Sequence, residues 1–282
     1  MDTSAADPES NSRTRGWNAD RLRGLALANG FLVLLLGAWW WQSIRSVPAR
    51  WPPPLDVFRL LDDFFWGDLA YHTLATLRRV VLAVIIAMII GGALVMLARS
   101  QPIARQLVNR RILPLFNAMP ALGWAILGVI WLGVNDLSVL VVEIAILIPF
   151  TMINLSEGLN VLDRNLLEMG QSFTRRRTRI TRLIEIPLLV PYLFAALRLS
   201  FGVGFKVAVI AEFFGAREGL GLVMNQARQS FNTTLVYATI MTVLLVVFAV
   251  ERLLFDPIGR LVARRLGTAE TAHPNPEAVV AA

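Results

Sequence analysis

Residues Leu77–Leu97 read LRRVVLAVIIAMIIGGALVML, a run that is apolar except for two arginine residues near its start. A helix that crosses the hydrocarbon core of a bilayer needs about 20 mostly apolar residues. This run has that length, and the small residues Gly91 and Gly92 permit close contact with a neighbouring helix. The stretch therefore predicts a transmembrane helix and places the chain among membrane proteins.

Similar apolar runs recur along the chain. The 282 residues are 56% hydrophobic and have a mean hydropathy of +0.58, which is typical of a membrane protein with several spans. Further spans are expected at about Gly24–Ile44, Ile112–Leu132, Leu137–Asn154 and Leu235–Phe255, and another starts after Pro187 and Pro191 and runs to about Phe214. The span Ile112–Leu132 contains Pro114 and Pro120, which break backbone hydrogen bonds within it. Between the first two spans, Arg45–Thr73 contains an amphipathic stretch, which predicts a helix on the outer membrane surface. The sequence thus predicts an all-α membrane protein with six transmembrane helices within residues 23–266.

The distribution of arginine predicts the orientation of these spans. The net charge is +7, and arginines gather beside apolar runs, chiefly in residues 13–23, 99–111, 164–182 and 260–265. Such an excess marks cytoplasmic loops, so both chain ends are expected in the cytoplasm, and nucleic-acid binding is disfavoured. The polar ends, residues 1–22 and 267–282, predict disordered cytoplasmic tails. The first span is too long for a cleaved signal peptide and lacks its cleavage signal.

One connection, residues 155–187, is much longer than the others. It carries Arg164, Arg175, Arg176, Arg177, Arg179 and Arg182. Leu162, Leu166, Met169 and Phe173 recur at helical spacing and predict one apolar stripe. Local physics leaves two interpretations open: the arginines orient the chain while the stripe packs on the protein's own helices, or the segment docks a cytoplasmic partner.

Several kinds of chemistry have no counterpart in the sequence. The chain contains no cysteine, and its two histidines, His72 and His273, are far apart, so no metal site and no catalytic residue are expected. It has no G-x-x-x-x-G-K-[ST] motif to hold phosphates, so it cannot hydrolyse ATP by itself. We therefore expect no cofactor on this chain and a role in transport.

Charged residues inside the spans require partners, because a charge at the bilayer centre costs about 2.5–3.5 kcal/mol on insertion scales. Glu143 and Lys206 lie at similar depth, so a structural ion pair between them is one interpretation. The other is that Lys206 attracts an anionic substrate. Arg198 is expected to extend toward the membrane interface, and Glu212 to lie at the outer helix end.

The long connection also resembles the EAA loop of ABC importer permeases. That pattern is E-A-A, three residues, Gly, nine residues, then I-x-L-P. Glu168 matches its first position, Thr174 stands at the glycine position, and Ile184–Pro187 completes the spacing, while Met169 and Gly170 replace the two alanines. The resemblance implies that an ATPase docks on this loop, through Leu166, Glu168, Met169, Gly170, Phe173, Thr174, Ile184 and Pro187.

The resemblance extends from about Trp51 to Arg265 and is closest to the nitrate/sulfonate/taurine-type permeases. The matching pieces are Pro52–Val57, Thr76–Val80, Pro120 with Trp131–Gly133, Ile148–Pro149, and Ala211–Gly215 with Gly219–Gly221. Each matching piece alone is weak evidence for this family, but their combination is specific to it. Departures from the family pattern occur at Asn117, Ile126 and Asn135, along the expected pathway helix.

This resemblance implies a type I ABC importer permease fold in a bacterial inner membrane. The chain would form a homodimer with two cytoplasmic ATPase subunits, which bind ATP and Mg²⁺, and with an external substrate-binding protein. Candidate path residues are Pro120, Glu143, Lys206 and Glu212. The implied substrate is a small anion such as nitrate, an alkylsulfonate or taurine, with a thiamine-precursor pyrimidine as the alternative. A secondary transporter without an ATPase is the rival class, which the lack of an internal repeat disfavours.

Overall fold

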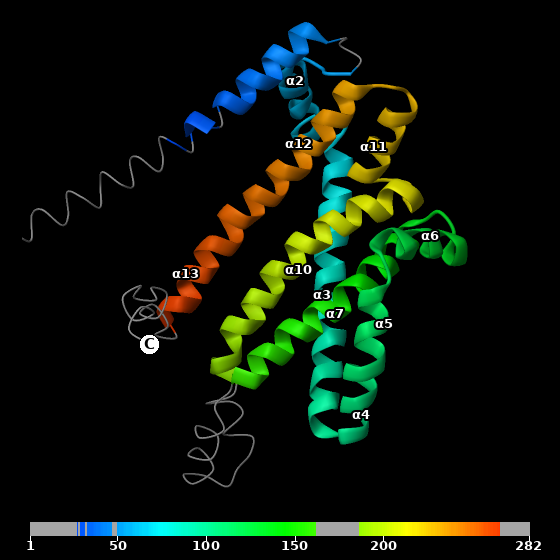
Figure 1. The fold of residues 1–282 in the computed structure, drawn as a ribbon, viewed down its shortest axis with the longest axis vertical. Helices are drawn as coiled ribbons and strands as arrows, with labels where there is room; N and C mark the ends of the chain where they lie inside the picture. The colour runs from blue at the N-terminus through cyan, green and yellow to red at the C-terminus, as the bar shows by residue number, and fades with distance from the viewer. Residues whose placement is uncertain (1–26, 28, 32, 47–49, 162–185, 266–282) are drawn as a thin grey trace, which may run out of the picture.

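The computed structural model describes residues 27, 29–31, 33–46, 50–161 and 186–265, and all regular structure within these ranges is helical (Figure 1). The long helices are α3 (Ala70–Ser100), α7 (Asp136–Val161), α10 (Ile186–Gly215) and α12 (Thr233–Val250), the last continued by the π-helical turn η3 (Glu251–Phe255) and α13 (Asp256–Arg265). Helix α10 is central, because it packs against α3, α6, α7 and α11.

Four of the predicted spans are confirmed as continuous helices. Within the described residues, four helices are long and apolar enough to cross a membrane: Ala70–Ala98, Asp136–Gly158, Leu189–Gly215 and Thr233–Arg264. Each contains the apolar run expected from the sequence and extends beyond it by several residues. The helices are longer than the apolar runs because a helix can continue outside the bilayer, where it carries polar residues that a hydropathy pattern excludes.

The span expected over Ile112–Leu132 is helical but sharply bent at one of its prolines. After α4 (Pro102–Leu107) and the π-helical turn η1 (Val108–Ile112), the chain forms α5 (Leu113–Ala118) and α6 (Ala121–Leu132), and the apolar helices on the two sides of the break are bent by 91°. The cause is Pro120, which has no N–H to continue the helix and disfavours helical geometry at the residue before it. Met119 is accordingly extended, with φ −84° and ψ 124°. The bent pair raises the number of candidate spans from four to five.

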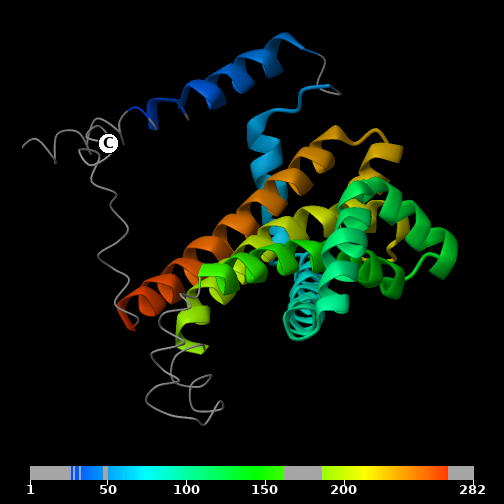
Figure 2. The ribbon, with the colours of Figure 1, turned by 60° about the horizontal axis from the view of Figure 1, so that its bottom comes forward.

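The first expected span is described in part. Residues 33–45 are helical, and this helix stands away from the bundle (Figure 2). Its contact with the bundle is aromatic: Trp39 stacks on Tyr237 with ring centroids 5.8 Å apart, and its Nε1 donates to the Pro52 carbonyl at 3.2 Å. Six transmembrane helices therefore remain a prediction.

Two short helices close one end of the bundle. Helix α2 (Pro54–Phe65) was expected on the membrane surface, but its buried Val57 and Phe64 belong to the core, because α2 packs against α3 and α12. Helix α11 (Leu220–Gln229) was not predicted, although Leu220, Val223 and Ala227 are buried at helical spacing. Both helices thus bury their apolar faces on protein.

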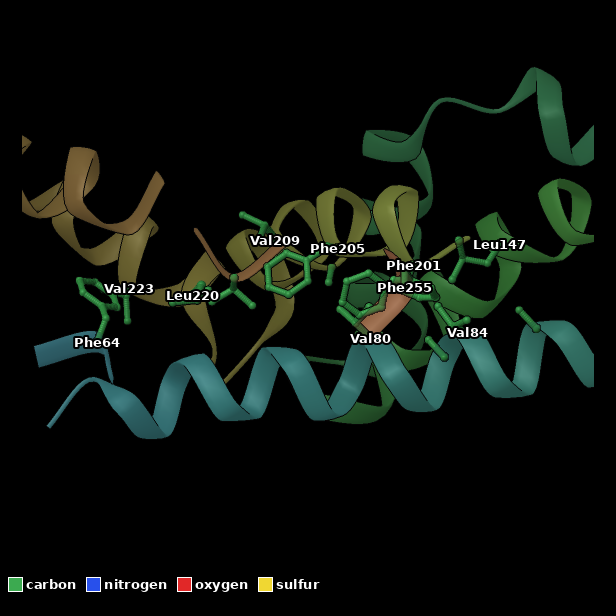
Figure 3. Close-up of a cluster of buried hydrophobic side chains, with 14 of the residues drawn as sticks. Phe64, Val80, Val84, Leu147, Phe201, Phe205, Val209, Leu220, Val223 and Phe255 are labelled. Atoms are coloured by element: carbon green, nitrogen blue, oxygen red, sulfur yellow. The ribbon is translucent and has the colours of Figure 1, made fainter. Parts of the chain in front are cut away.

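The core runs along α3 (Figure 3). Val80 and Val84 of α3 belong to one buried cluster with Leu147 of α7 and with Phe201 and Phe205 of α10. Small residues bring the helices together elsewhere: a Cβ atom added to Gly91 would lie 3.0 Å from the Thr151 Cβ. The close contact predicted for Gly91 is therefore confirmed.

Candidate functional site

The structure describes the two ends of the predicted coupling segment, residues 155–187. Residues 162–185 lie outside the described part of the chain, and so do Leu166, Glu168, Met169, Gly170, Phe173, Thr174 and Ile184. Pro187, the remaining predicted coupling residue, is the second residue of α10. A proline is favoured there, because the first N–H groups of a helix have no partner within it.

The described ends of this segment lie side by side at the lower left of the bundle in Figure 1. Helix α7 ends at Val161 and α10 begins at Ile186. Near these ends, a Cβ atom added to Gly158 would lie 2.5 Å from the Tyr192 Cβ, so the two backbones are as close as a glycine allows. The chain therefore leaves α7 and enters α10 at one place, which we call the loop end of the bundle.

The opposite end, which we call the α11 end, contains a buried cluster of charges around Glu212. Arg79 donates through Nη1 to Glu212 Oε1 and through Nη2 to Asp136 Oδ1, the latter at 2.9 Å. Thr76 Oγ1 and the Gly221 N–H donate to Glu212 Oε2 at 2.8 and 3.0 Å. These five residues form what we call the Glu212 network, and the side chains of Arg79 and Glu212 are only 5% and 0% exposed.

Two glycines bring the backbone onto the Glu212 carboxylate. Gly219 has φ +119°, and a Cβ atom there would lie 2.4 Å from the carboxylate carbon. A Cβ on Gly221 would lie 2.3 Å from the Val209 carbonyl oxygen. Neither position has room for a side chain, which gives a physical reason for the Gly-Leu-Gly sequence at the start of α11.

A second carboxylate lies at the rim of the network. Glu218 pairs with Arg78 at 3.2 Å, accepts a hydrogen bond from the Tyr71 hydroxyl, and lies 3.8 Å from the Arg79 guanidinium. The turn between α10 and α11 is thus held to the start of α3 from both sides.

This arrangement is suited to holding helices together. Arg79 lies on α3, Asp136 on α7, Glu212 on α10 and Gly221 on α11, so the Arg79 guanidinium and the Glu212 carboxylate together connect four elements. Removing one member of a buried ion pair leaves an uncompensated charge, which costs about 3–5 kcal/mol. Glu212 was expected at an outer helix end and beside the path. In this conformation it is fully buried, and its carboxylate faces protein groups.

The predicted ion pair between Glu143 and Lys206 is wrong. Glu143 is fully buried, and neither of its carboxylate oxygens has a hydrogen-bond partner among the described residues. Lys206 is exposed. The two lie at similar depth, but α7 packs on the side of α10 that contains Gly204, which lies next to Leu147. Lys206 follows Gly204 by two residues, about 200° further around the helix, and so faces away from α7.

Arg198 does not extend freely toward the interface as expected. Its guanidinium donates to Glu251 Oε1 at 2.6 Å and to Asp256 Oδ1 at 3.0 Å, and Asp256 also pairs with Arg252 at 2.9 Å. This cluster connects α10 to η3 and α13. The sequence shows these charges, but not that α13 continues α12 and returns beside α10.

Pro120 lies at the bend between α5 and α6 and is exposed. Beside it, Trp124 packs against Phe116 with ring centroids 5.3 Å apart. The indole Nε1 of Trp124 is buried and has no hydrogen-bond partner in the described ranges. The bend thus places an unsatisfied donor at the side of the bundle formed by α5 and α6.

Comparison with known proteins adds a family and a fold. A family described as "Binding-protein-dependent transport system inner membrane component" matches residues 80–268. The taurine transport system permease protein TauC of Escherichia coli (strain K12) is 28% identical over 249 residues, covering 85% of this chain and 90% of TauC. The putative aliphatic sulfonates transport permease protein SsuC of Bacillus subtilis (strain 168) is 28% identical over 155 residues, covering 55% and 54%.

Among solved structures, an inward-facing form of the MetNI methionine ABC transporter matches with a TM-score of 0.60. The match covers 69% of this chain and 95% of the other, at 18% sequence identity. At that identity the likeness concerns the fold alone.

Proposed function

The chain belongs to the family of binding-protein-dependent transport system inner membrane components, and on that premise we propose that it forms the path of an ATP-driven importer for a small anion. Membership makes it the permease of an ABC importer, a multi-pass inner-membrane protein and a transport subunit rather than an enzyme. The solute, the stoichiometry and the roles of single residues are the proposed part.

The observation that carries the proposal is the loop end. Helices α7 and α10 approach to glycine contact at Gly158 and Tyr192, so a force applied to the segment between them acts on both helices together. That segment is rich in arginine, which supports a location in the cytoplasm, where ATPase subunits are found. The proposed assembly is a homodimer of this chain with six spans each, two ATPase subunits that hold ATP and Mg²⁺, and an external binding protein.

In this proposal both chain ends and the loop end are cytoplasmic, and the α11 end faces outward. The coupling residues are those of the EAA-like segment, centred on Glu168. ATP-driven closure of the ATPase pair shifts α7 and α10 relative to the partner copy, so the path opens to one side at a time. The buried Glu212 network keeps the outer ends of the helices together during this movement.

Substrate choice follows from the named relatives. The TauC and SsuC names specify taurine and aliphatic sulfonates, which share a sulfonate group. We therefore propose taurine or an alkylsulfonate, both of which carry an anionic sulfonate group, with nitrate as a further small anion and a thiamine-precursor pyrimidine as the alternative.

The direct test is transport. The permease would be co-expressed with the ATPase and the binding protein of the proposed assembly and placed in proteoliposomes. Uptake of labelled taurine and ethanesulfonate would be measured with and without ATP. ATP-dependent uptake is expected. Uptake that depends on an ion gradient and is unchanged by ATP would establish that the chain is a secondary transporter.

A second test addresses the coupling segment. Glu168→Arg reverses a charge at the proposed ATPase contact and should lower uptake by about tenfold or more, because lost interfacial charge pairs cost several kcal/mol. Glu157→Arg is the matched control, since it makes the same charge reversal at an exposed residue of α7 that is not among the proposed coupling residues. Equal uptake by the two variants would remove Glu168 from the coupling contact.

A further inference from the structure

Lys206 lies on a face of α10 that no described element covers. Leu199, Lys206, Ile210 and Phe214 are exposed and fall on one side of the helix at spacings of seven, four and four. On the same side, an added Cβ at Gly202 would meet no atom within 4 Å. We call this the open face of α10.

The open face lies deep in the span. Lys206 is nine residues, or about 13 Å, from the α11 end of α10 at Gly215. The hydrocarbon core of a bilayer is about 30 Å thick, so Lys206 lies near its middle. A lysine at that depth is costly against lipid, and intramembrane lysines therefore face protein, water or a counter-charge.

The described part of the chain does not supply that counter-charge. In the described spans the acidic residues are Asp136, Glu143, Glu157, Glu212, Glu251 and Asp256. Asp136 and Glu212 are bonded to Arg79, and Glu251 and Asp256 to Arg198. Glu143 is fully buried on the far side of α10.

A second copy of the chain that packed against the open face without intervening water would not supply the counter-charge either. Two copies with the same membrane orientation place equal residues at equal depth. Glu157, the remaining acidic residue, lies ten residues beyond Leu147 toward the loop end, whereas Lys206 lies two residues beyond Gly204 in the other direction. The two differ in depth by about 18 Å.

We propose that Lys206 lies in the wall of the water-filled transport path and that its counter-charge is a dissolved anion, including the transported one. The ligand class is a small sulfonate, carboxylate or other oxyanion, and this assignment rests on the proposed function. A single flexible ammonium attracts an anion without enclosing it, which suits a path that must also release its solute.

The test measures the charge of the path without requiring the substrate. Because the chain contains no cysteine, a single Ile210→Cys change reports from the residue one turn away on the open face. The Ile210→Cys change would be made in three backgrounds, with Lys206 unchanged, with Lys206→Met and with Lys206→Arg. Each protein would be studied as the full complex in membrane vesicles. Labelling rates would be compared for a negatively charged sulfonatoethyl methanethiosulfonate and a positively charged trimethylammonium-ethyl methanethiosulfonate.

With Lys206 present, the anionic reagent should react about threefold faster, and the cationic reagent about threefold slower, than with Lys206→Met. These factors follow from unit charges about 6 Å apart in water. Lys206→Arg should keep the preference for the anion. Ile240→Cys, on the exposed apolar face of α12, is the matched control and should react with neither reagent.

Two results would overturn the proposal: no reaction at Ile210→Cys with either reagent, or the same anion-to-cation ratio with Lys206 and with Lys206→Met. If Lys206→Met reduces folded yield, Lys206→Gln provides a second neutral background. ATP-dependent uptake is measured on the same vesicles. Charge-selective labelling without ATP-dependent uptake would contradict the proposed importer function but support a water-exposed open face. ATP-dependent uptake without charge-selective labelling would support the importer function but contradict the role proposed for Lys206.

Discussion

Arg79 is the residue on which the α11 end depends most. Its guanidinium is buried between Glu212 and Asp136, which come from helices that are distant in sequence. Desolvating a guanidinium is expensive, and the cost is offset only while its partners remain in place.

We expect Arg79→Met to lower the free energy of unfolding by about 3–5 kcal/mol, because it leaves the Glu212 carboxylate buried and unpaired. Combining it with Glu212→Gln should restore much of the loss. Thermal unfolding of the purified protein in detergent measures both effects. Arg78→Met is the control and should cost at most about 1 kcal/mol, since the Arg78 side chain is 66% exposed. Equal losses for the two arginines would show that the network contributes no special stability.

Gly219 is the second decisive residue. Gly219→Ala should destabilise the protein by about 1–3 kcal/mol or more, because the backbone conformation disfavours a side chain and the new methyl group would meet the Glu212 carboxylate. Gly202→Ala, at a helical position with open space, should be neutral or slightly stabilising. The two variants can be ranked by melting temperature, and the reverse order would contradict the described turn.

At the scale of elements, the pairing of α7 with α10 determines how the loop end behaves. The two helices approach at Gly158 and Tyr192 and are joined again by a long contact between Thr151 and Ser200, whose hydroxyl oxygens are 3.5 Å apart. Helices that pack through small residues separate when one of those residues is enlarged.

Gly158→Ala should therefore cost about 1–3 kcal/mol of stability, because its methyl group would lie 2.5 Å from the Tyr192 Cβ and overpack the contact. Gly92→Ala between α3 and α7 serves as the control, since its methyl group would make ordinary contact with Leu155 at 3.6 Å. Melting temperatures in detergent would show the difference. A Gly158→Ala protein as stable as the Gly92→Ala protein would contradict the close packing at the loop end.

The bend between α5 and α6 shows the limit of hydropathy at this scale. The apolar length of Ile112–Leu132 predicts a span, and Pro120 predicts a break within it. Neither property gives the angle of 91°, because the direction of a helix after a break is set by what it packs against. Here α6 packs against α7 and α10.

For the whole molecule, the main prediction is its orientation. Helix α10 has 30 residues and is about 45 Å long, more than the hydrocarbon core requires, so the loop end and the α11 end lie on opposite sides of the membrane. Single cysteines at Ser172, in the arginine-rich segment, and at Phe231, 86% exposed beside α11, should react with an impermeant maleimide from opposite sides.

In intact cells only Phe231→Cys should be labelled, and after permeabilisation both should be. The cysteine-free parent is the control for background reaction. Labelling of Ser172→Cys in intact cells would reverse the proposed topology and remove the cytoplasmic ATPase contact with it.

The sequence by itself determined where the four long apolar helices lie, that Pro120 breaks the span Ile112–Leu132 and which segment carries the arginines. These are local properties, because apolar length, helical spacing and missing N–H groups act within one segment. Only the tertiary structure decided that Arg79 pairs with Glu212, 133 residues away, and that Lys206 faces away from Glu143. Depth along a helix can be counted from sequence, but the side on which a neighbour packs depends on the arrangement of all the helices, and that side decides which charges meet.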